Sequence, residues 1–356
     1  MNRISIQLGR FKLDQRRIVP NNRQLLCQTV HVVLSLLLFS LDADAVGAQN
    51  ERCDPAKVIG SETCAKCHVN EVSSWKQTPH FRTFDELGRR PEAKAICDKL
   101  GLRSVKRSDV CIDCHFTMQN VESQVRPISG ISCESCHGAA APWIELHNNF
   151  GGPTATRESE TSAHAAQRFA ASLAGGMHNT RNLYQIASSC FHCHTVPNES
   201  LVNIGGHKAG SEDFELVRWS QGRVRHNFLR TAGQTNANSS PERLRVMFVI
   251  GLMADLEFST RATAMATKNS TYGTTVANRA ARVALRLYEV QQKIQDPHVQ
   301  RALQAFAGAE LRLNNALKLL AIADEIKQAG EMFALENDGT QLAILDPWLP
   351  NPSEYR

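Results

Sequence analysis

Residues Gly130–His147 read GISCESCHGAAAPWIELH and contain the short pattern around which the rest of the chain is interpreted. The pattern is C-x-x-C-H, formed by Cys133, Cys136 and His137. Two cysteines three positions apart in a helix present their thiols on one side. The pattern is typical of covalent attachment of a c-type haem, whose iron the following histidine binds as proximal ligand. His147 follows ten residues later and is a candidate ligand for the other side of an iron.

The same pattern occurs three more times in the chain. Each copy predicts two thioether bonds to a haem and one proximal histidine, so we expect four covalently bound haem c groups. Structural zinc sites also use paired cysteines, but zinc does not explain why a histidine follows every pair. The motif residues are Cys64, Cys67 and His68; Cys111, Cys114 and His115; Cys133, Cys136 and His137; and Cys190, Cys193 and His194.

Residues 1–48 resemble a secretory signal peptide. A basic segment precedes an apolar run from Val32 to Leu41, which is much shorter than the ~20 residues of a membrane-spanning helix. Removing these residues lowers the formal charge from +5 to +2, since they carry six Arg or Lys and three Asp. Haem propionates lower the charge further. We therefore expect a periplasmic or otherwise exported protein with no membrane span after cleavage and no nucleic-acid partner.

The composition predicts a mainly α protein with two parts after the signal. Residues 49–238 contain all four motifs, are rich in Gly, Pro and polar residues, and have little strand signal. We expect a tetrahaem cytochrome c domain there, made of short helices and loops wrapped around four haems. Aromatic residues are only 6% of the chain, which suits an interior filled by large cofactors.

Residues 239–356 lack cysteine and are predicted to form a C-terminal helical bundle of three or four helices. Ser240 and Pro241 are helix-start signals, and a second helix is expected to end near Ile294. Asp296 starts a third helix, which we expect Gly330 to break or bend. Long helices of this kind also offer a surface for a homo-oligomer. The apolar stripe of the third helix consists of Val299, Leu303, Phe306, Leu313, Leu317 and Leu320.

Histidines outside the motifs are candidates for the second axial ligand of each iron. His192 lies inside its own motif and is expected to point away from that iron, and His298 is expected at the surface of a helix start. Two cysteines after the signal, Cys53 and Cys97, lie outside the motifs, and a disulfide between them is left open. The distal candidates are His80, His147, His207, His226 and His178.

Two stretches carry a resemblance to a known family. Val58–His68 with Trp75, Thr78 and His80, and the segment Gly130–Gly138, resemble the cytochrome c-554 type of multihaem cytochromes. The resemblance extends over about half of the chain, from Val58 to Phe228.

The resemblance implies haems packed in close pairs, between which electrons hop. It implies that His80 binds the iron of the last haem and that His147 binds the haem of its own preceding motif. A histidine after the fourth motif, His207 or His226, is implied as ligand of the first haem. The second haem is implied to be five-coordinate, but the surplus histidines, His178 among them, put this vacancy in doubt.

The sequence therefore favours an exported electron carrier that exchanges electrons with redox partner proteins in a respiratory or nitrogen-cycle chain. Two imidazoles on an iron leave no position for a substrate, which favours a carrier over an enzyme. The alternative is a multihaem oxidoreductase that acts on a small nitrogen or sulfur compound at an open haem. Tyr184 is the one tyrosine considered for a cross-link to haem in such an enzyme. A third alternative is a sensor or scaffold whose helical tail is the active part.

Overall fold

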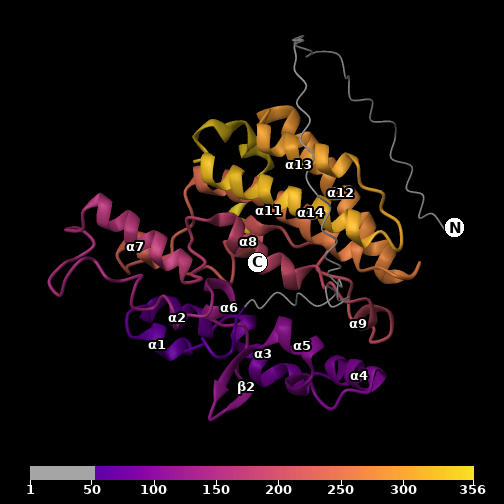
Figure 1. Ribbon diagram of the computed structural model, residues 1–356, viewed down its shortest axis with the longest axis horizontal. Helices are drawn as coiled ribbons and strands as arrows, with labels where there is room; N and C mark the ends of the chain where they lie inside the picture. The colour runs from indigo at the N-terminus through magenta and orange to yellow at the C-terminus, as the bar shows by residue number, and fades with distance from the viewer. Residues whose placement is uncertain (1–52) are drawn as a thin grey trace, which may run out of the picture. The chain divides into compact units, whose positions relative to one another are not determined.

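The computed structural model describes residues 53–356, which belong to one compact unit (Figure 1). The predicted signal peptide, residues 1–48, lies outside the described residues. The described part of the chain is mainly helical, so the predicted mainly α class is confirmed. None of its helices is long and apolar enough to cross a membrane.

The first half of the described chain consists of short helices joined by loops. Each of the four motifs lies in or at the end of one of these helices. The helices are α1 (Ser61–Ala65), α2 (Val69–Lys76), α3 (Pro79–Glu86), η1 (Leu87–Arg89), α4 (Pro91–Leu100), η2 (Val105–Arg107), α5 (Asp109–His115), α6 (Cys133–His137), α7 (Ser162–Ala174), α8 (Leu183–His194), α9 (Glu199–Asn203), α10 (Leu216–Ser220) and η3 (Phe228–Thr231).

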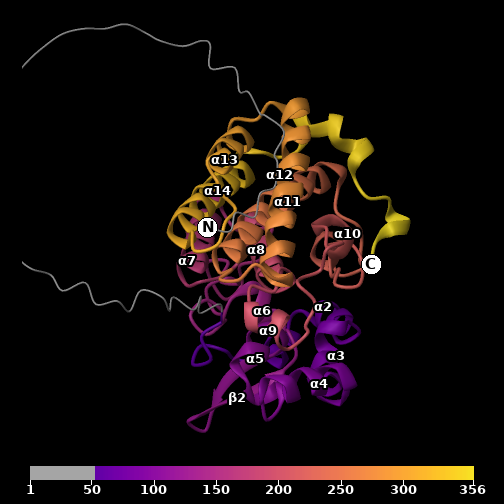
Figure 2. The ribbon, with the colours of Figure 1, turned by 90° about the vertical axis from the view of Figure 1, so that its right-hand side faces the viewer.

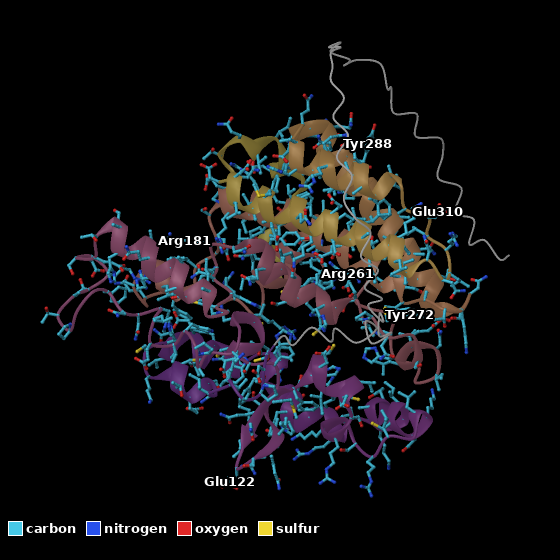
Figure 3. All side chains as sticks on the ribbon, in the orientation of Figure 1. Glu122, Arg181, Arg261, Tyr272, Tyr288 and Glu310 are labelled. Carbon is cyan, nitrogen blue, oxygen red and sulfur yellow. The ribbon has the colours of Figure 1, made fainter. Side chains whose placement is uncertain are left out.

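A β-hairpin between the second and third motifs was not expected. Strands β1 (Thr117–Val121) and β2 (Gln124–Ser129) pair antiparallel, with Val121 opposite Gln124. The two turn residues, Glu122 and Ser123, have φ values of 52° and 65°, and Glu122 is at the hairpin tip (Figure 3). Two-residue hairpin turns with positive φ at both positions usually contain Asn-Gly or Asp-Gly. The Glu-Ser pair lacks that signal, which is why the hairpin is hard to predict.

The C-terminal part consists of four helices of 11 to 24 residues followed by 3-10 segments. Helix α11 is central among them, because it contacts α12, α14, α8 and η4 and has buried side chains on all its faces. A helix that is buried all round is expected only at the centre of such a group. The elements are α11 (Pro241–Ala264), α12 (Thr271–Ile294), α13 (Pro297–Ala307), α14 (Ala316–Glu336), η4 (Thr340–Trp348) and η5 (Pro352–Glu354).

Helices α11 and α13 begin where the sequence predicts, after Ser240 and Asp296. The Ser240 hydroxyl accepts a hydrogen bond from the Arg243 amide, and the Asp296 carboxylate accepts one from His298 and one from Val299. These side chains satisfy amide groups that have no partner inside the helix.

Two expectations for the third helix were wrong. The predicted third helix ends at Ala307, and Leu317 lies on the separate helix α14. Leu317 is 89% exposed, so it does not belong to the core. Gly330 does not break α14 but lies within it. A Cβ at position 330 would overlap the ring of Tyr184, so the glycine allows α8 and α14 to approach closely.

Helix α8 joins the haem-motif region to the C-terminal helices. It contacts α5 and α6, which carry the second and third motifs, and also α11 and α14 (Figures 1 and 2). Its buried residues Tyr184, Ala187 and Phe191 belong to the largest apolar cluster, which otherwise comes mainly from α10 to α14 and η4. The cluster around the second motif is small and includes Cys97, Cys111 and Phe116. Ordinary apolar packing is therefore concentrated in the C-terminal helices.

The contact between Gly330 and Tyr184 predicts that replacing this helical glycine by alanine destabilises the protein, the reverse of the usual effect. Alanine normally favours a helix over glycine by ~1 kcal/mol, but here the added methyl overlaps a fully buried ring. We expect Gly330→Ala to lower the free energy of unfolding by about 1–3 kcal/mol, measured by chemical denaturation. Gly308→Ala is the control, because its Cβ would meet only one atom, at 3.6 Å. Equal effects of the two substitutions would contradict this packing.

Candidate haem-binding site

The third motif forms the whole of α6 and is held by a buried network of hydroxyl groups. Ser132 and Ser135 form a capping box at the start of the helix. The Thr117 hydroxyl lies 3.0 Å from the Ser132 hydroxyl and 2.8 Å from the Ser135 hydroxyl, and it donates to the Gly130 carbonyl. Thr117 lies two residues after His115, so the second and third motifs are connected through this network.

Glu134, inside the third motif, ties α6 to the start of the first motif. Its buried carboxylate accepts hydrogen bonds from the amides of Ile59, Gly60 and Ala140, at 3.0, 2.8 and 2.8 Å. Hydrogen bonds to a charged group are stronger than neutral ones. A single side chain on α6 thus holds two further backbone segments, at residues 59–60 and at Ala140, beside two of the cysteine pairs.

Thiols from different motifs also lie side by side. A hydrogen bond with Cys133 lowers the pKa of the Cys64 thiol and raises that of Cys133, so the first and third motifs meet at their first cysteines. Burial, together with the neighbouring thiol of Cys97, raises the pKa of Cys111 to about 11. No disulfide joins Cys97 to Cys53, whose sulfur lies 3.6 Å from the carbonyl oxygen of Glu134.

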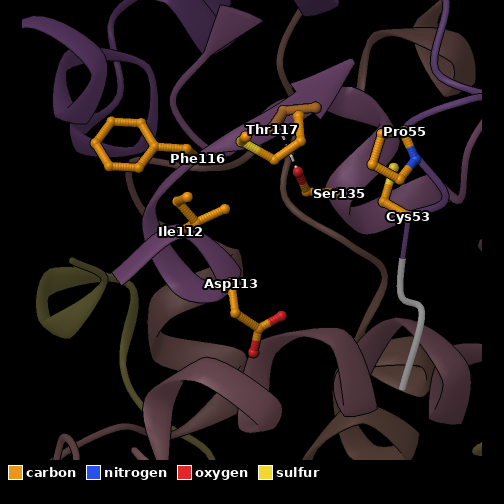
Figure 4. A pocket seen from close by; sticks show the side chains of 8 residues that line it. Cys53, Pro55, Ile112, Asp113, Phe116, Thr117 and Ser135 are labelled. Atoms are coloured by element: carbon orange, nitrogen blue, oxygen red, sulfur yellow. Dashed lines mark hydrogen bonds between the residues drawn. The ribbon is translucent and has the colours of Figure 1, made fainter. Parts of the chain in front are cut away.

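A small pocket lies between the second and third motifs (Figure 4). Cys53 and Pro55 line one part of it, and Ile112, Asp113 and Phe116 line another. Ser135 and Thr117 are joined by a hydrogen bond at its wall. The pocket therefore adjoins two neighbouring haem-binding motifs.

Each of the four motif histidines faces one histidine from outside the motifs. The distances between the ring centres fall in a narrow range, from 6.1 to 6.4 Å. The pairs are His68 with His147 (6.3 Å), His194 with His80 (6.4 Å), His115 with His207 (6.4 Å) and His137 with His226 (6.1 Å).

This spacing is the one that two imidazoles on opposite sides of one metal ion require. A metal–imidazole bond is about 2 Å long and the nitrogen lies about 1 Å from its ring centre, so the two centres lie about 6 Å apart. Rotation about the shared nitrogen–iron–nitrogen axis leaves this distance unchanged. The different interplanar angles of the pairs, from 28° to 89°, therefore fit the same arrangement. The residues present fit four haem irons.

Five of the paired imidazoles have lowered pKa values, which favour the unprotonated form that can bind iron. Burial, followed by the neighbouring histidine of each pair, lowers the pKa of His115, His137 and His194 to about 4. Burial also lowers the pKa of His80 and His147. A metal ligand must be the unprotonated imidazole, so these sites favour metal binding at neutral pH.

Hydrogen bonds at Nδ1 leave Nε2 of several rings for the iron. Metal-binding histidines usually use their second nitrogen to contact a carbonyl, carboxylate or hydroxyl group, which fixes the orientation of the ring. Nδ1 contacts a backbone carbonyl oxygen in four of these rings: His137 with His178 (3.1 Å), His147 with Ile144 (2.5 Å), His207 with Lys208 (2.8 Å) and His226 with Val224 (2.7 Å). In His194 it contacts the Ser211 hydroxyl (3.1 Å).

The indole of Trp143 supplies a further observation in favour of a bound group. Its ring lies edge-on to His147, with ring centres 5.3 Å apart. Within the described residues its buried Nε1 has no hydrogen-bond partner. Buried polar groups nearly always have a partner, and a propionate of a haem beside His147 is a suitable acceptor for this N–H.

The structure changes two of the pairings expected from the family resemblance. His147 faces His68 of the first motif instead of His137 of its own preceding motif, and His226 faces His137. Short turns lie between α6 and His147, in which the amides of Ile144 and His147 donate to the carbonyls of Ala140 and Trp143. His80 lies against the fourth motif, where the resemblance expects it.

His207 lies against the second motif, next to His115. The ring of His178 lies against the backbone of the third motif, and its predicted role as a ligand stays a prediction. Its Nδ1 lies 3.1 Å from the Cys136 carbonyl, and its backbone amide donates to His137. His178 thus supports the backbone of the third motif, a role that no short sequence signal indicates.

His192 forms a contact between two motifs. Its Nε2 lies 2.6 Å from the carboxylate of Asp113, so a residue inside the fourth motif is joined to a residue inside the second. With Cys114 these side chains resemble a small metal cluster. Because Cys114 is predicted to carry haem, we interpret the contact as a link between α5 and α8.

Tyr184 is buried against the C-terminal helices. Its hydroxyl donates to the buried carboxylate of Glu257 on α11, at 2.7 Å. Burial raises the pKa of this phenol well above its ordinary value. Tyr184 is therefore a packing residue between α8 and α11.

Comparisons with known proteins agree with the sequence resemblance. Residues 63–138, which include the first three motifs, match the family described as cytochrome c554 and c-prime. The chain is 30% identical over 100 residues to cytochrome c-554 of Nitrosomonas europaea (strain ATCC 19718 / CIP 103999 / KCTC 2705 / NBRC 14298), a match of 26% of this chain and 43% of the relative. The chain thus spans less than half the length of that relative.

No solved structure matches the chain. The resemblance to the cytochrome c-554 type is confirmed for the matched part, and it implies covalently bound haem c. The fourth motif and the C-terminal helices lie outside the family match.

An ion-paired arginine holds the His147 segment and provides a test by pH. Arg168 on α7 donates to the His147 carbonyl at 2.8 Å and binds Glu160 through two hydrogen bonds, at 2.7 and 2.6 Å. Hydrogen bonding from Arg168 holds the pKa of Glu160 at about 2, below its ordinary value of 4.5. A carboxyl group whose pKa is lower in the folded than in the unfolded protein stabilises the fold at pH values above the unfolded-state pKa. This stabilisation is lost as the pH falls toward the folded-state pKa.

We expect Glu160→Gln to destabilise the protein at pH 6–7, and the difference from wild type to shrink as the pH falls from 4.5 toward about 2. The measurement is the free energy of unfolding of both proteins across this range. A difference that stays constant from neutral pH to pH 2 would mean that Glu160 does not act through its charge.

Proposed function

We propose that the protein is an exported tetrahaem c-type cytochrome that carries electrons between redox partner proteins. The observation that supports this most directly is the four histidine pairs at one common spacing. The match to the cytochrome c554 and c-prime family over the first three motifs supports the same function.

The proposed cofactors are four haem groups, each bound by the two cysteines of one motif. The proximal ligands are His68, His115, His137 and His194, and the distal ligands are His147, His207, His226 and His80 in the same order. Bound haem supplies reversible one-electron chemistry. The protein supplies one imidazole on each side of each iron.

Two axial histidines favour electron transfer over substrate chemistry. A reductase or oxidase needs an iron position that a small substrate can occupy, and the resemblance suggested such a position at the second haem. His207 faces His115 there, so the second pair is built like the other three. The oxidoreductase alternative gains no support from Tyr184, which is buried against Glu257.

Contacts between motifs support a connected path for electrons. Cys64 and Cys133 link the first and third motifs, and His192 and Asp113 link the fourth and second. The backbone of His178 donates to His137 just before α8, which carries the fourth motif. These links join the first haem to the third, the third to the fourth and the fourth to the second, and the Thr117 network adds a link between the second and the third.

Export and association are further parts of the proposal. The motifs need haem attachment outside the cytoplasm, which agrees with the signal-like segment 1–48. Redox partner proteins are the expected partners, whereas association through the C-terminal helices stays a prediction.

The second haem offers the sharpest test of the carrier proposal. We expect His207→Ala to convert one haem of four from low spin to high spin and to let that haem bind carbon monoxide, measured by optical and EPR spectroscopy of the haem-loaded protein. The wild-type protein should hold four haems by mass and bind no carbon monoxide.

His298→Ala is the matched control, because its ring contacts Glu336 on α14 and the variant should stay low spin. A wild-type protein with an open, carbon monoxide-binding haem would contradict the carrier. An unaltered spectrum of His207→Ala would remove His207 from the ligand set.

A further inference from the structure

The proximal histidine of the fourth motif is held in place by a residue of the C-terminal helices. Arg279 on α12 donates through Nη1 to the backbone carbonyls of His194 and Ser211, both at 3.2 Å. The Ser211 amide donates to the same His194 carbonyl at 2.9 Å, and the Ser211 hydroxyl lies 3.1 Å from His194 Nδ1. Arg279 therefore fixes both His194 and the residue that contacts its imidazole.

The guanidinium of Arg279 is buried and closely fitted. Its Nε and Nη2 atoms bind the carboxylate of Asp255 on α11, at 2.6 and 3.1 Å. Arg279 is 4% exposed and Asp255 is 8% exposed. Gly210, at φ +90°, leaves room for the guanidinium, since a Cβ there would lie 3.0 Å from both Arg279 Nη1 and the His194 carbonyl.

Stability alone does not account for this ion pair. Removing two charges from water is costly, so an apolar pair of similar volume is often at least as stable. The orientation of this pair is specific, because its positive group points to the motif and its negative group lies on the far side, on α11. Inside a protein, charge interactions are weakly screened, so such a pair creates a field at the adjacent imidazole.

Groups that contact a metal ligand from outside the coordination shell orient it and tune the metal. The ring of His194 is also stacked on Phe214, with ring centres 4.2 Å apart, so contacts from several directions limit its rotation. Arg279 brings a full positive charge from the C-terminal helices to the backbone carbonyl of His194.

We propose that Arg279, held by Asp255, is a positioning residue that sets the reduction potential of the fourth haem and thereby couples the C-terminal helices to electron transfer. This inference rests on the proposed function, because it requires a haem at the fourth motif. The positive group favours the reduced iron, which carries one positive charge less than the oxidised iron.

The test is Arg279→Gln in the full haem-loaded protein, followed by redox titration of all four haems. We expect the potential of one haem to fall and the other three to stay unchanged, with an altered EPR signal of the same haem. Arg245→Gln is the matched control, because Arg245 also binds an aspartate, Asp346, and a backbone carbonyl, that of Gly339, but contacts no haem motif. It should leave all four potentials unchanged.

A second variant covers the case in which Arg279→Gln fails to fold. The double substitution Asp255→Leu with Arg279→Met replaces the pair by apolar side chains of similar volume, and it should again lower the potential of one haem. Unchanged potentials in a folded variant overturn the inference but leave the carrier proposal standing. Fewer than four haems in the wild-type protein would contradict the proposed function itself.

Discussion

The pairing of each motif histidine with a histidine from another part of the chain, at one common spacing, constrains this structure more than any other interaction. One imidazole of each pair follows a cysteine pair directly, but the other comes from a distant part of the chain. Closing such long loops costs chain entropy, and bonds to a metal can supply folding free energy in return. The short helices and loops of the first half are arranged so that four separate pairs reach the same spacing.

The two halves of the described chain therefore use different means of stabilisation. The C-terminal helices with α8 have a large apolar cluster. The haem-motif region has a small one and relies on polar ties, such as the Glu134 carboxylate with its three amide donors. Buried polar groups that are fully bonded specify one arrangement. A region that must orient flat, rigid cofactors benefits from such directional contacts.

Sequence reasoning predicted the motifs, the mainly α class and the start of the long helices, because these depend on local patterns. C-x-x-C-H is a five-residue signal, and Ser240 and Asp296 are capping residues beside prolines. The pairing of His147, His207 and His226 was not predictable, since it depends on how distant loops fold back. The hairpin was missed because Glu122 and Ser123 lack the usual turn residues. The role of Gly330 was also misjudged, because it depends on Tyr184, which lies far away in the sequence.

The histidine pairs interlock along the chain. The first members, His68, His80, His115 and His137, all precede the second members, His147, His194, His207 and His226. A polypeptide that emerges from its N-terminus therefore exposes three complete cysteine motifs before any iron can gain its second histidine. With the proposed ligands, the first three haems pass through a stage in which each is held by one histidine and is open to small molecules. With these ligands, the second histidine of every haem becomes available only when the segment from His147 to His226 has folded back onto the motifs.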